Sequence, residues 1–191
     1  MTESDAGSRA GEERVATLAA QRVLAIDGSV VRLRQAWGSR PVVQVLLRHF
    51  GCIFCHQMVA DVLAVTPTIA SHGGHVVLVG CGTVEHATKF AKHKRLPREG
   101  VTLYCDPGRE SYDAIGLEHS YAKTFFSGGA RAAYVAARKA GHRVSGVAGD
   151  IAQLGGAFVI APPARLLYEH RSRFAGDHPS VGAILEALRS A

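Results

Sequence analysis

Gly-Cys-Ile-Phe-Cys-His, residues 51–56, is the stretch of sequence that decides the fold. It follows a nearly unbroken apolar run over residues 42–47, which is typical of a buried strand. After it, apolar residues recur at steps of three and four from Met58 to Ile69, which predicts one face of a helix. Cys52 and Cys55 are therefore placed where a central strand ends and a helix begins.

This position favours a cysteine thiolate. A helix N-terminus has unpaired N–H groups and the positive end of the helix dipole. Such surroundings lower a cysteine pKa from about 8.5 towards roughly 7 or below. We expect Cys52 to attack and Cys55 to resolve the resulting mixed disulfide or sulfenic acid. The alternative is that both are ordinary cysteines of the core.

The composition indicates one globular domain. The chain has 191 residues, of which 47% are hydrophobic and 20% charged, and no apolar run is long enough to span a membrane. Residues 1–14 are polar and lack the basic start and apolar run of a secretory signal. We expect them to be a disordered tail before a single domain over 15–191, in a cytoplasmic protein.

Charge and cysteine content exclude several function classes. The net charge of +6 is concentrated near residues 89–98 and 131–143, without the interleaved aromatic residues of single-strand nucleic-acid binding. We interpret both clusters as solvated helix faces and expect no nucleic-acid or membrane partner. Four cysteines in a cytoplasmic chain also argue against a structural disulfide framework.

Strands and helices alternate along the chain. The expected elements are a helical turn at 15–22, a hairpin over 23–33, strands at 42–48, 75–80, 101–105, 157–160 and 166–170, and helices after the cysteines, at 84–94, 110–116, 131–140 and after Asp177. Pro67 should kink the first long helix near Thr66, and Thr83 should cap the next one. Residues 117–130 remain unassigned, and 144–156 are expected to form a glycine-rich loop.

This order predicts the fold class. Alternation of strands and helices implies a parallel sheet with helices on both faces, and the closing hairpin makes the sheet mixed. A β-α-β half joined by a helix to a β-β-α half is the thioredoxin arrangement. The fold class is therefore α/β and thioredoxin-like, with a central mixed sheet flanked by helices and an N-terminal β-hairpin.

Two other uses of the motif must be weighed. With His56 it reads Cys-x-x-Cys-His, the attachment signature of c-type haem, but a strand leads into it and neither Met1 nor Met58 is a suitable axial ligand. Structural zinc needs four ligands, and only one close cysteine pair exists. We therefore expect no cofactor and no metal, with a c-type haem carrier as an outside alternative.

Further residues could belong to the site. Arg48 and His49 immediately precede the motif, and either could stabilise a thiolate or polarise a bound peroxide. Gly156 stands before the strand at 157–160, where a thioredoxin-like fold brings a loop next to the cysteines. Cys81 and Cys105 are interpreted as small hydrophobic residues of the core, with a resolving role for Cys81 as a weaker alternative.

These residues carry a resemblance to a known family. The chain resembles the peroxiredoxin-like 2 group, which includes prostamide/prostaglandin F synthase-like proteins, in the alkyl hydroperoxide reductase and thiol-specific antioxidant superfamily. The matching pieces, in the family's order, are 48–55, 149–159, and His170-Arg171 with Gly176-Asp177. The resemblance implies that 15–191 form a thioredoxin-like, peroxiredoxin-type domain. It also implies thiol-dependent redox activity, with Cys52 and Cys55 as the redox pair.

The chain also departs from related patterns. Peroxiredoxins typically carry P-x-x-x-T-x-x-C, and the positions of Pro and Thr before Cys52 are held by Val45 and His49. Gly156 stands where thioredoxin has a proline before the corresponding strand. The pattern leaves open which of the two cysteines attacks.

Two function hypotheses follow. The first is a thiol-dependent, peroxiredoxin-like antioxidant oxidoreductase whose redox-active disulfide forms between Cys52 and Cys55. Its partners would be a peroxide or another small oxidised substrate and an external thiol reductant such as a thioredoxin-type protein, and a homodimer is compatible with this function. The second is a redox-sensing or binding protein with a thioredoxin fold and no turnover.

Overall fold

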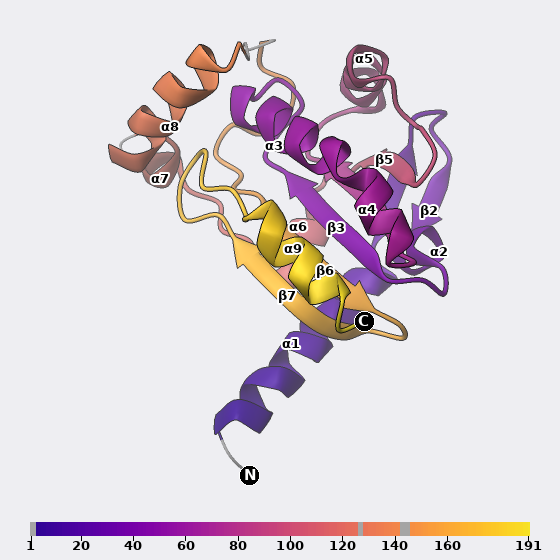
Figure 1. The fold of residues 1–191 in the computed structure, drawn as a ribbon. Coiled ribbons are helices and arrows are strands. Elements are labelled where there is room, and N and C mark those ends of the chain that lie inside the picture. The colour runs from indigo at the N-terminus through magenta and orange to yellow at the C-terminus, as the bar shows by residue number, and fades with distance from the viewer. Residues whose placement is uncertain (1–2, 126–127, 142–145) are drawn as a thin grey trace.

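A computed structural model describes residues 3–125, 128–141 and 146–191, whose seven strands form one twisted sheet (Figure 1). The strands are β1 (Arg22–Ala25), β2 (Val30–Arg32), β3 (Val42–Leu47), β4 (His75–Gly80), β5 (Val101–Cys105), β6 (Gly156–Ala161) and β7 (Arg165–Arg171). Their order across the sheet is β2-β1-β5-β4-β3-β6-β7. The neighbours β3, β4 and β5 are parallel, and the remaining pairs are antiparallel. The expected mixed sheet with its N-terminal hairpin is confirmed.

Strand β3 lies inside the sheet and is buried along its whole length. Val43, Val45 and Leu47 belong to the hydrophobic core on one face of the sheet, and Val42 and Leu46 belong to the core on the other. Because successive side chains of a strand point to opposite faces, an unbroken apolar run is what a strand covered on both sides requires.

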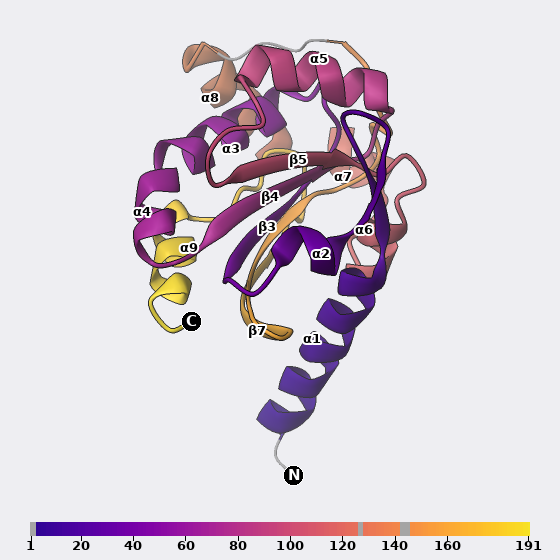
Figure 2. The same cartoon turned by 90° about the vertical axis from the view of Figure 1, so that its right-hand side faces the viewer.

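Helices cover both faces of the sheet (Figure 2). The helices are α1 (Glu3–Ala20), α2 (Leu33–Trp37), α3 (Ile53–Ala64), α4 (Thr66–Ser71), α5 (Val84–Lys94), α6 (Glu110–Ile115), α7 (Tyr121–Phe125), α8 (Gly128–Lys139) and α9 (Val181–Leu188). Buried residues of α3, α4, α5 and α9 form one core with the sheet, and those of α1, α2 and α6 form the other. None of the helices in the described part of the chain is long and apolar enough to cross a bilayer.

Two local predictions from the sequence, the break near Thr66 and the Thr83 cap, are confirmed. The helix after the cysteines breaks at Val65, and Pro67 lies in the first turn of α4, where its missing N–H leaves no intrahelical bond unmade. Thr83 caps α5 by accepting a hydrogen bond from the His86 backbone N–H.

The structure differs from the expected elements at both ends of the chain. In place of a tail over 1–14 and a helical turn at 15–22, α1 is one continuous helix from Glu3 to Ala20. Val15 and Leu18 of this helix are fully buried against the second core, which anchors its C-terminal half. Asp177 does not cap the last helix. Ser180 is its N-cap and accepts a hydrogen bond from the Ala183 N–H.

We predict that Leu78→Ala lowers the free energy of unfolding by about 2–5 kcal/mol, because Leu78 is fully buried on β4 and its loss leaves a cavity. Chemical denaturation would measure this change. The matched control is Val30→Ala on edge strand β2, where the side chain is 62% exposed and the expected change is within about 0.5 kcal/mol. Equal losses in the two variants would contradict the assignment of β4 to the centre of the core.

Candidate active site

The two cysteines of the motif lie between β3 and α3. Strand β3 ends at Leu47, a short connection follows, and Cys52 is the N-cap of α3. Cys55 lies in the first turn of the same helix. Both side chains are buried and both cysteines are free thiols, so the structure shows the reduced state. The strand-to-helix position predicted for the motif is confirmed.

Cys52 lies in the wall of a cavity of about 600 Å³. Apolar side chains make up most of the wall, and they come from α3, from α8 and from the loop before β6. The residues that line it include Arg48, His49, Cys52, Phe54, Thr124, Arg131, Tyr134, Val135 and Ile151. Cys55 and His56 are not among the residues that line it. Of the two motif cysteines, Cys52 is therefore the one that faces a space for a ligand.

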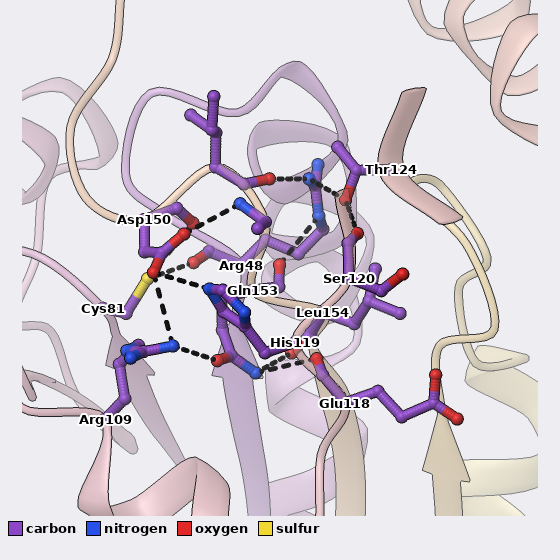
Figure 3. Close-up of polar contacts among 12 residues, drawn as sticks. Arg48, Cys81, Arg109, Glu118, His119, Ser120, Thr124, Asp150, Gln153 and Leu154 are labelled. Carbon is purple, nitrogen blue, oxygen red and sulfur yellow. Dashed lines mark hydrogen bonds and ion pairs between the residues drawn. The ribbon is translucent and has the colours of Figure 1, made fainter. Parts of the chain in front are cut away.

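Arg48 is a cation in direct contact with Cys52. Its Nη1 donates a hydrogen bond to the Cys52 Sγ at 3.1 Å. Its other nitrogens donate to the carbonyl oxygens of Gln153 (3.1 Å) and Ile151 (2.7 Å) and to the Thr124 hydroxyl (3.2 Å), as Figure 3 shows. Arg48 is only 6% exposed, so this guanidinium is held in one orientation inside the protein.

These surroundings lower the pKa of Cys52 to about 6. The largest cause is a hydrogen bond donated by the Cys55 thiol, and the positive charge of Arg48 acts in the same direction. Burial opposes both effects, while the backbone N–H groups of Cys55 and Phe54 at the start of α3 support them. At neutral pH Cys52 is therefore mainly a thiolate.

Cys55 has the opposite character. Burial raises the pKa of its thiol well above the ordinary value, and the hydrogen bond that it donates to Cys52 raises it further. Cys55 therefore keeps its proton at neutral pH and presents it to the neighbouring sulfur. One motif contains a nucleophilic thiolate and a protonated partner, which is the arrangement needed for attack followed by disulfide formation.

The two histidines beside the motif differ in what surrounds them. His49 lines the cavity, and burial lowers its pKa to about 4, so the imidazole is neutral at neutral pH. Its Nδ1 is buried and has no hydrogen-bond partner among the described residues. The His56 ring packs against Phe90, with ring centroids 5.0 Å apart, and against His93 at 5.3 Å. His56 therefore belongs to the contact between α3 and α5.

The loop before β6 packs directly on the motif. Gly149 has φ +125°, and a Cβ there would lie 1.6 Å from the Cys81 carbonyl oxygen. A Cβ on Gly51 would lie 1.8 Å from the Gly146 carbonyl oxygen. The Phe50 N–H also donates to the Ala148 carbonyl oxygen at 3.0 Å. Glycine at 51 and 149 thus permits a backbone contact that any side chain would prevent.

Gly156 and the remaining cysteines lie close to this region. Gly156 begins β6 and pairs with Leu46 of β3, one strand away from the motif, but it is not among the residues that line the cavity. Cys81 is more than a small apolar residue, because its Sγ donates a hydrogen bond to the Arg48 carbonyl oxygen. Burial raises the pKa of Cys81 to about 12 and that of Cys105 to about 11, so both remain thiols.

Three parts of the site were not predicted from the sequence. Thr124 and the carbonyls of Ile151 and Gln153 hold Arg48 from 76 to 105 residues away in the sequence. Arg131, assigned to a solvated helix face, lines the cavity. The sequence indicated that the loop before 157–160 lies near the cysteines, but it did not indicate which of its residues hold Arg48, because backbone acceptors leave no mark in side-chain patterns.

Comparison with known proteins identifies the family. The family model described as AhpC/TSA antioxidant enzyme matches residues 63–173, which is more than half of the chain. The protein belongs to the AhpC/TSA antioxidant enzyme family. This confirms the superfamily inferred from the sequence and assigns the chain to the thiol-dependent, peroxidase-like oxidoreductases. The match begins after the two cysteines, so it carries no information on their roles.

Curated relatives match over nearly the whole chain. Thioredoxin-like protein AAED1, chloroplastic, from Arabidopsis thaliana is 25% identical, covering 98% of this chain and 77% of that protein. Peroxiredoxin-like 2C from Mus musculus is 25% identical, covering 97% and 85%. The prostamide/prostaglandin F synthase of Salmo salar is 27% identical, covering 87% and 81%. These similarities bear out the resemblance to the peroxiredoxin-like 2 group.

Solved structures confirm the fold class. Peroxiredoxin Q of Xanthomonas campestris superposes with a TM-score of 0.64 at 14% identity, covering 92% of this chain and 93% of that one. Peroxidoxin BcpB of Mycobacterium tuberculosis superposes with a TM-score of 0.63 at 16% identity, covering 89% and 92%. The thioredoxin-like fold of peroxiredoxins is therefore shared although few residues are identical.

We predict that the Cys52 thiol titrates near pH 6 and that Cys55 stays protonated through neutral pH, because Arg48 and the Cys55 thiol both stabilise the charge on Cys52. Site-resolved mass spectrometry of iodoacetamide alkylation against pH measures both midpoints. In the control, Cys52→Ser, Cys55 should remain unreactive at pH 7. A Cys52 midpoint at the ordinary value of about 8.5 would contradict the prediction.

Proposed function

We propose that this protein reduces hydroperoxides, with Cys52 as the attacking nucleophile and Cys55 as the resolving thiol. The proposal is supported above all by one contact: the Arg48 guanidinium lies 3.1 Å from the Cys52 Sγ in the wall of a cavity. Thiolate character and access to substrate decide cysteine reactivity, and of the two motif cysteines only Cys52 has both.

The first step is attack of the Cys52 thiolate on the outer oxygen of a hydroperoxide. A sulfur–oxygen bond forms, the oxygen–oxygen bond breaks, and the departing alkoxide takes a proton from solvent to become an alcohol. The sulfur is oxidised to sulfenic acid and the peroxide is reduced. Arg48 is placed to hold the peroxide oxygens once the sulfur gives up its charge, and the neutral His49 can donate one hydrogen bond to them.

The second step joins the two cysteines. The Cys55 thiol condenses with the Cys52 sulfenic acid, so a disulfide forms and water leaves. The interaction of the Cys55 thiol with Cys52, which shifts both pKa values, supports this pairing. An external dithiol then reduces the disulfide by thiol–disulfide exchange and returns both cysteines to the reduced state.

We predict that Cys52→Ser abolishes peroxide reduction, whereas Cys55→Ser, treated with peroxide in the absence of any reductant, consumes one equivalent and stops with Cys52 as sulfenic acid. Peroxide consumption with dithiothreitol as reductant measures turnover, and dimedone labelling followed by mass spectrometry locates the sulfenic acid. Cys105→Ala is the control, because this core cysteine on β5 should leave the rate unchanged. Full peroxidase activity in Cys52→Ser would disprove the proposal.

The same experiment separates catalysis from redox sensing. If Cys52 oxidises once with peroxide but the wild-type protein shows no turnover with any reductant, the protein is a redox sensor. A stable rate over many equivalents of peroxide assigns it to the enzymes.

We further propose that the substrate is an organic hydroperoxide with an apolar group. The cavity wall is mostly apolar, and Tyr134 and Val135 of α8 are large hydrophobic residues that remain about half exposed at its edge. The prostamide/prostaglandin F synthase name of several relatives is compatible with a substrate larger than hydrogen peroxide. An apolar wall binds the alkyl part of such a substrate through buried area.

We predict that Tyr134→Ala raises the KM for cumene hydroperoxide about fivefold, which corresponds to about 1 kcal/mol of lost apolar contact, and leaves the kinetics with hydrogen peroxide unchanged. Steady-state rates with both peroxides measure the effect. Tyr121→Ala is the matched control, because Tyr121 is 59% exposed and does not belong to the cavity wall. Equal changes for both peroxides would contradict an apolar substrate site.

The reductant and the compartment complete the proposal. A disulfide buried at the start of α3 needs a small or well-fitted dithiol, and we propose a thioredoxin-type protein for this role. The proposed cycle needs a supply of reduced dithiol, which the cytoplasm maintains, and we therefore propose a cytoplasmic protein.

A further inference from the structure

The position of Arg48 depends on a distant loop. Among the described residues, the guanidinium donates, apart from Cys52, to the backbone carbonyls of Ile151 and Gln153 and to the Thr124 hydroxyl. Two of these three partners belong to residues 150–153, which precede β6. If this loop moved, the two carbonyls that face Arg48 would move with it.

The carboxylate of Asp150 holds the loop in place. Its Oδ1 accepts a hydrogen bond from the Ala152 N–H at 2.9 Å, which closes a tight turn inside the loop. Its Oδ2 accepts from His119 Nε2 at 2.8 Å and lies 3.3 Å from the Arg109 guanidinium (Figure 3). Burial raises the pKa of Asp150, but the Ala152 N–H, His119 and Arg109 lower it overall, so the group is a carboxylate at neutral pH.

Gln153 joins the same network from the other side. It is fully buried, and its Nε2 donates to the carbonyl oxygens of Glu118 and Leu154, while Arg109 donates to its Oε1 at 3.5 Å. The Leu154 N–H also donates to the Glu118 carbonyl oxygen at 3.0 Å. The segment before α7 is thus hydrogen-bonded to the loop before β6, and Arg109 contacts two residues of that loop (Figure 3).

We propose that Asp150 is a positioning residue for the Cys52 thiolate and acts through Arg48, with His119 and Arg109 as its anchors. Ile151 lines the cavity, but neither Asp150 nor His119 belongs to its wall as the described residues form it. Their effect on the sulfur is indirect. The carboxylate fixes the turn of the loop, the loop carbonyls hold the guanidinium, and the guanidinium donates to Cys52. This role rests on the proposed function of Cys52.

The conservative substitution Asp150→Asn tests the proposal. The amide can still accept the Ala152 N–H, but its NH2 group would face the donors of His119 and Arg109, so the loop loses its outer anchor. We expect the alkylation midpoint of Cys52 to rise by about one pH unit, because Arg48 is no longer held against the sulfur. The control is Asp113→Asn on the neighbouring helix α6, where the carboxylate is exposed and no change is expected.

A double-mutant cycle shows whether the effect runs through Arg48. Arg48→Met should itself raise the Cys52 midpoint, and Asp150→Asn should then add nothing in that background. An equal additional rise would overturn the proposal, because it would show that Asp150 affects the sulfur independently of Arg48. An unchanged Cys52 midpoint in folded Asp150→Asn protein would overturn it directly.

A second variant covers loss of folding in Asp150→Asn. His119→Ala removes one anchor at a side chain that is 39% exposed, and it should raise the Cys52 midpoint by a smaller amount, whereas His119→Gln keeps a donor and should restore it. The midpoint is read by alkylation and requires no peroxide turnover. A low wild-type midpoint without peroxidase activity would therefore refute the proposed function and leave the positioning role testable. Peroxidase activity together with an unchanged Cys52 midpoint in the Asp150 variant would refute the positioning role and leave the proposed function standing.

Discussion

The hydrogen bond between Arg48 and Cys52 is the contact on which the rest of the site depends. Both groups are more than nine-tenths buried, and a buried guanidinium is costly unless each of its donors has a partner. Of its five N–H groups, three donate to oxygen acceptors among the described residues and a fourth donates to the sulfur. The thiolate therefore completes a set of contacts that would otherwise lack an anion, which explains how a sulfur in the core can be charged.

The hydrogen bond between the two motif cysteines shifts their pKa values in opposite directions. Cys52 lies at the helix terminus beside Arg48, while Cys55 lies one turn further into the core, where burial dominates. A single proton between the sulfurs favours the charged form of the first and the neutral form of the second. These opposite pKa directions are what supports the proposal of Cys52 as the nucleophile and Cys55 as its protonated partner.

The sequence predicted the sheet more completely than the site. The apolar run at 42–47 and the alternation of strands and helices are consequences of burial on both faces, and burial is visible in side-chain type. The contacts that hold Arg48 use backbone carbonyls from residues 151 and 153, and every residue type carries a carbonyl. Asp177 shows why residue type alone does not fix where a helix begins. Both Asp177 and Ser180 are suitable N-caps, and only the path of the chain selects Ser180.

Stabilising the thiolate also affects the later steps of the reaction. In the proposed cycle, a disulfide between Cys52 and Cys55 would remove the charge of the first sulfur and the proton of the second. Arg48 would then face its oxygen partners without an anion, which is costly for a buried cation. Interactions that favour the reduced form make a disulfide more oxidising, as in thiol oxidoreductases whose thiolate is strongly stabilised. The guanidinium that lowers the pKa of Cys52 would therefore also favour the return of the disulfide to the dithiol.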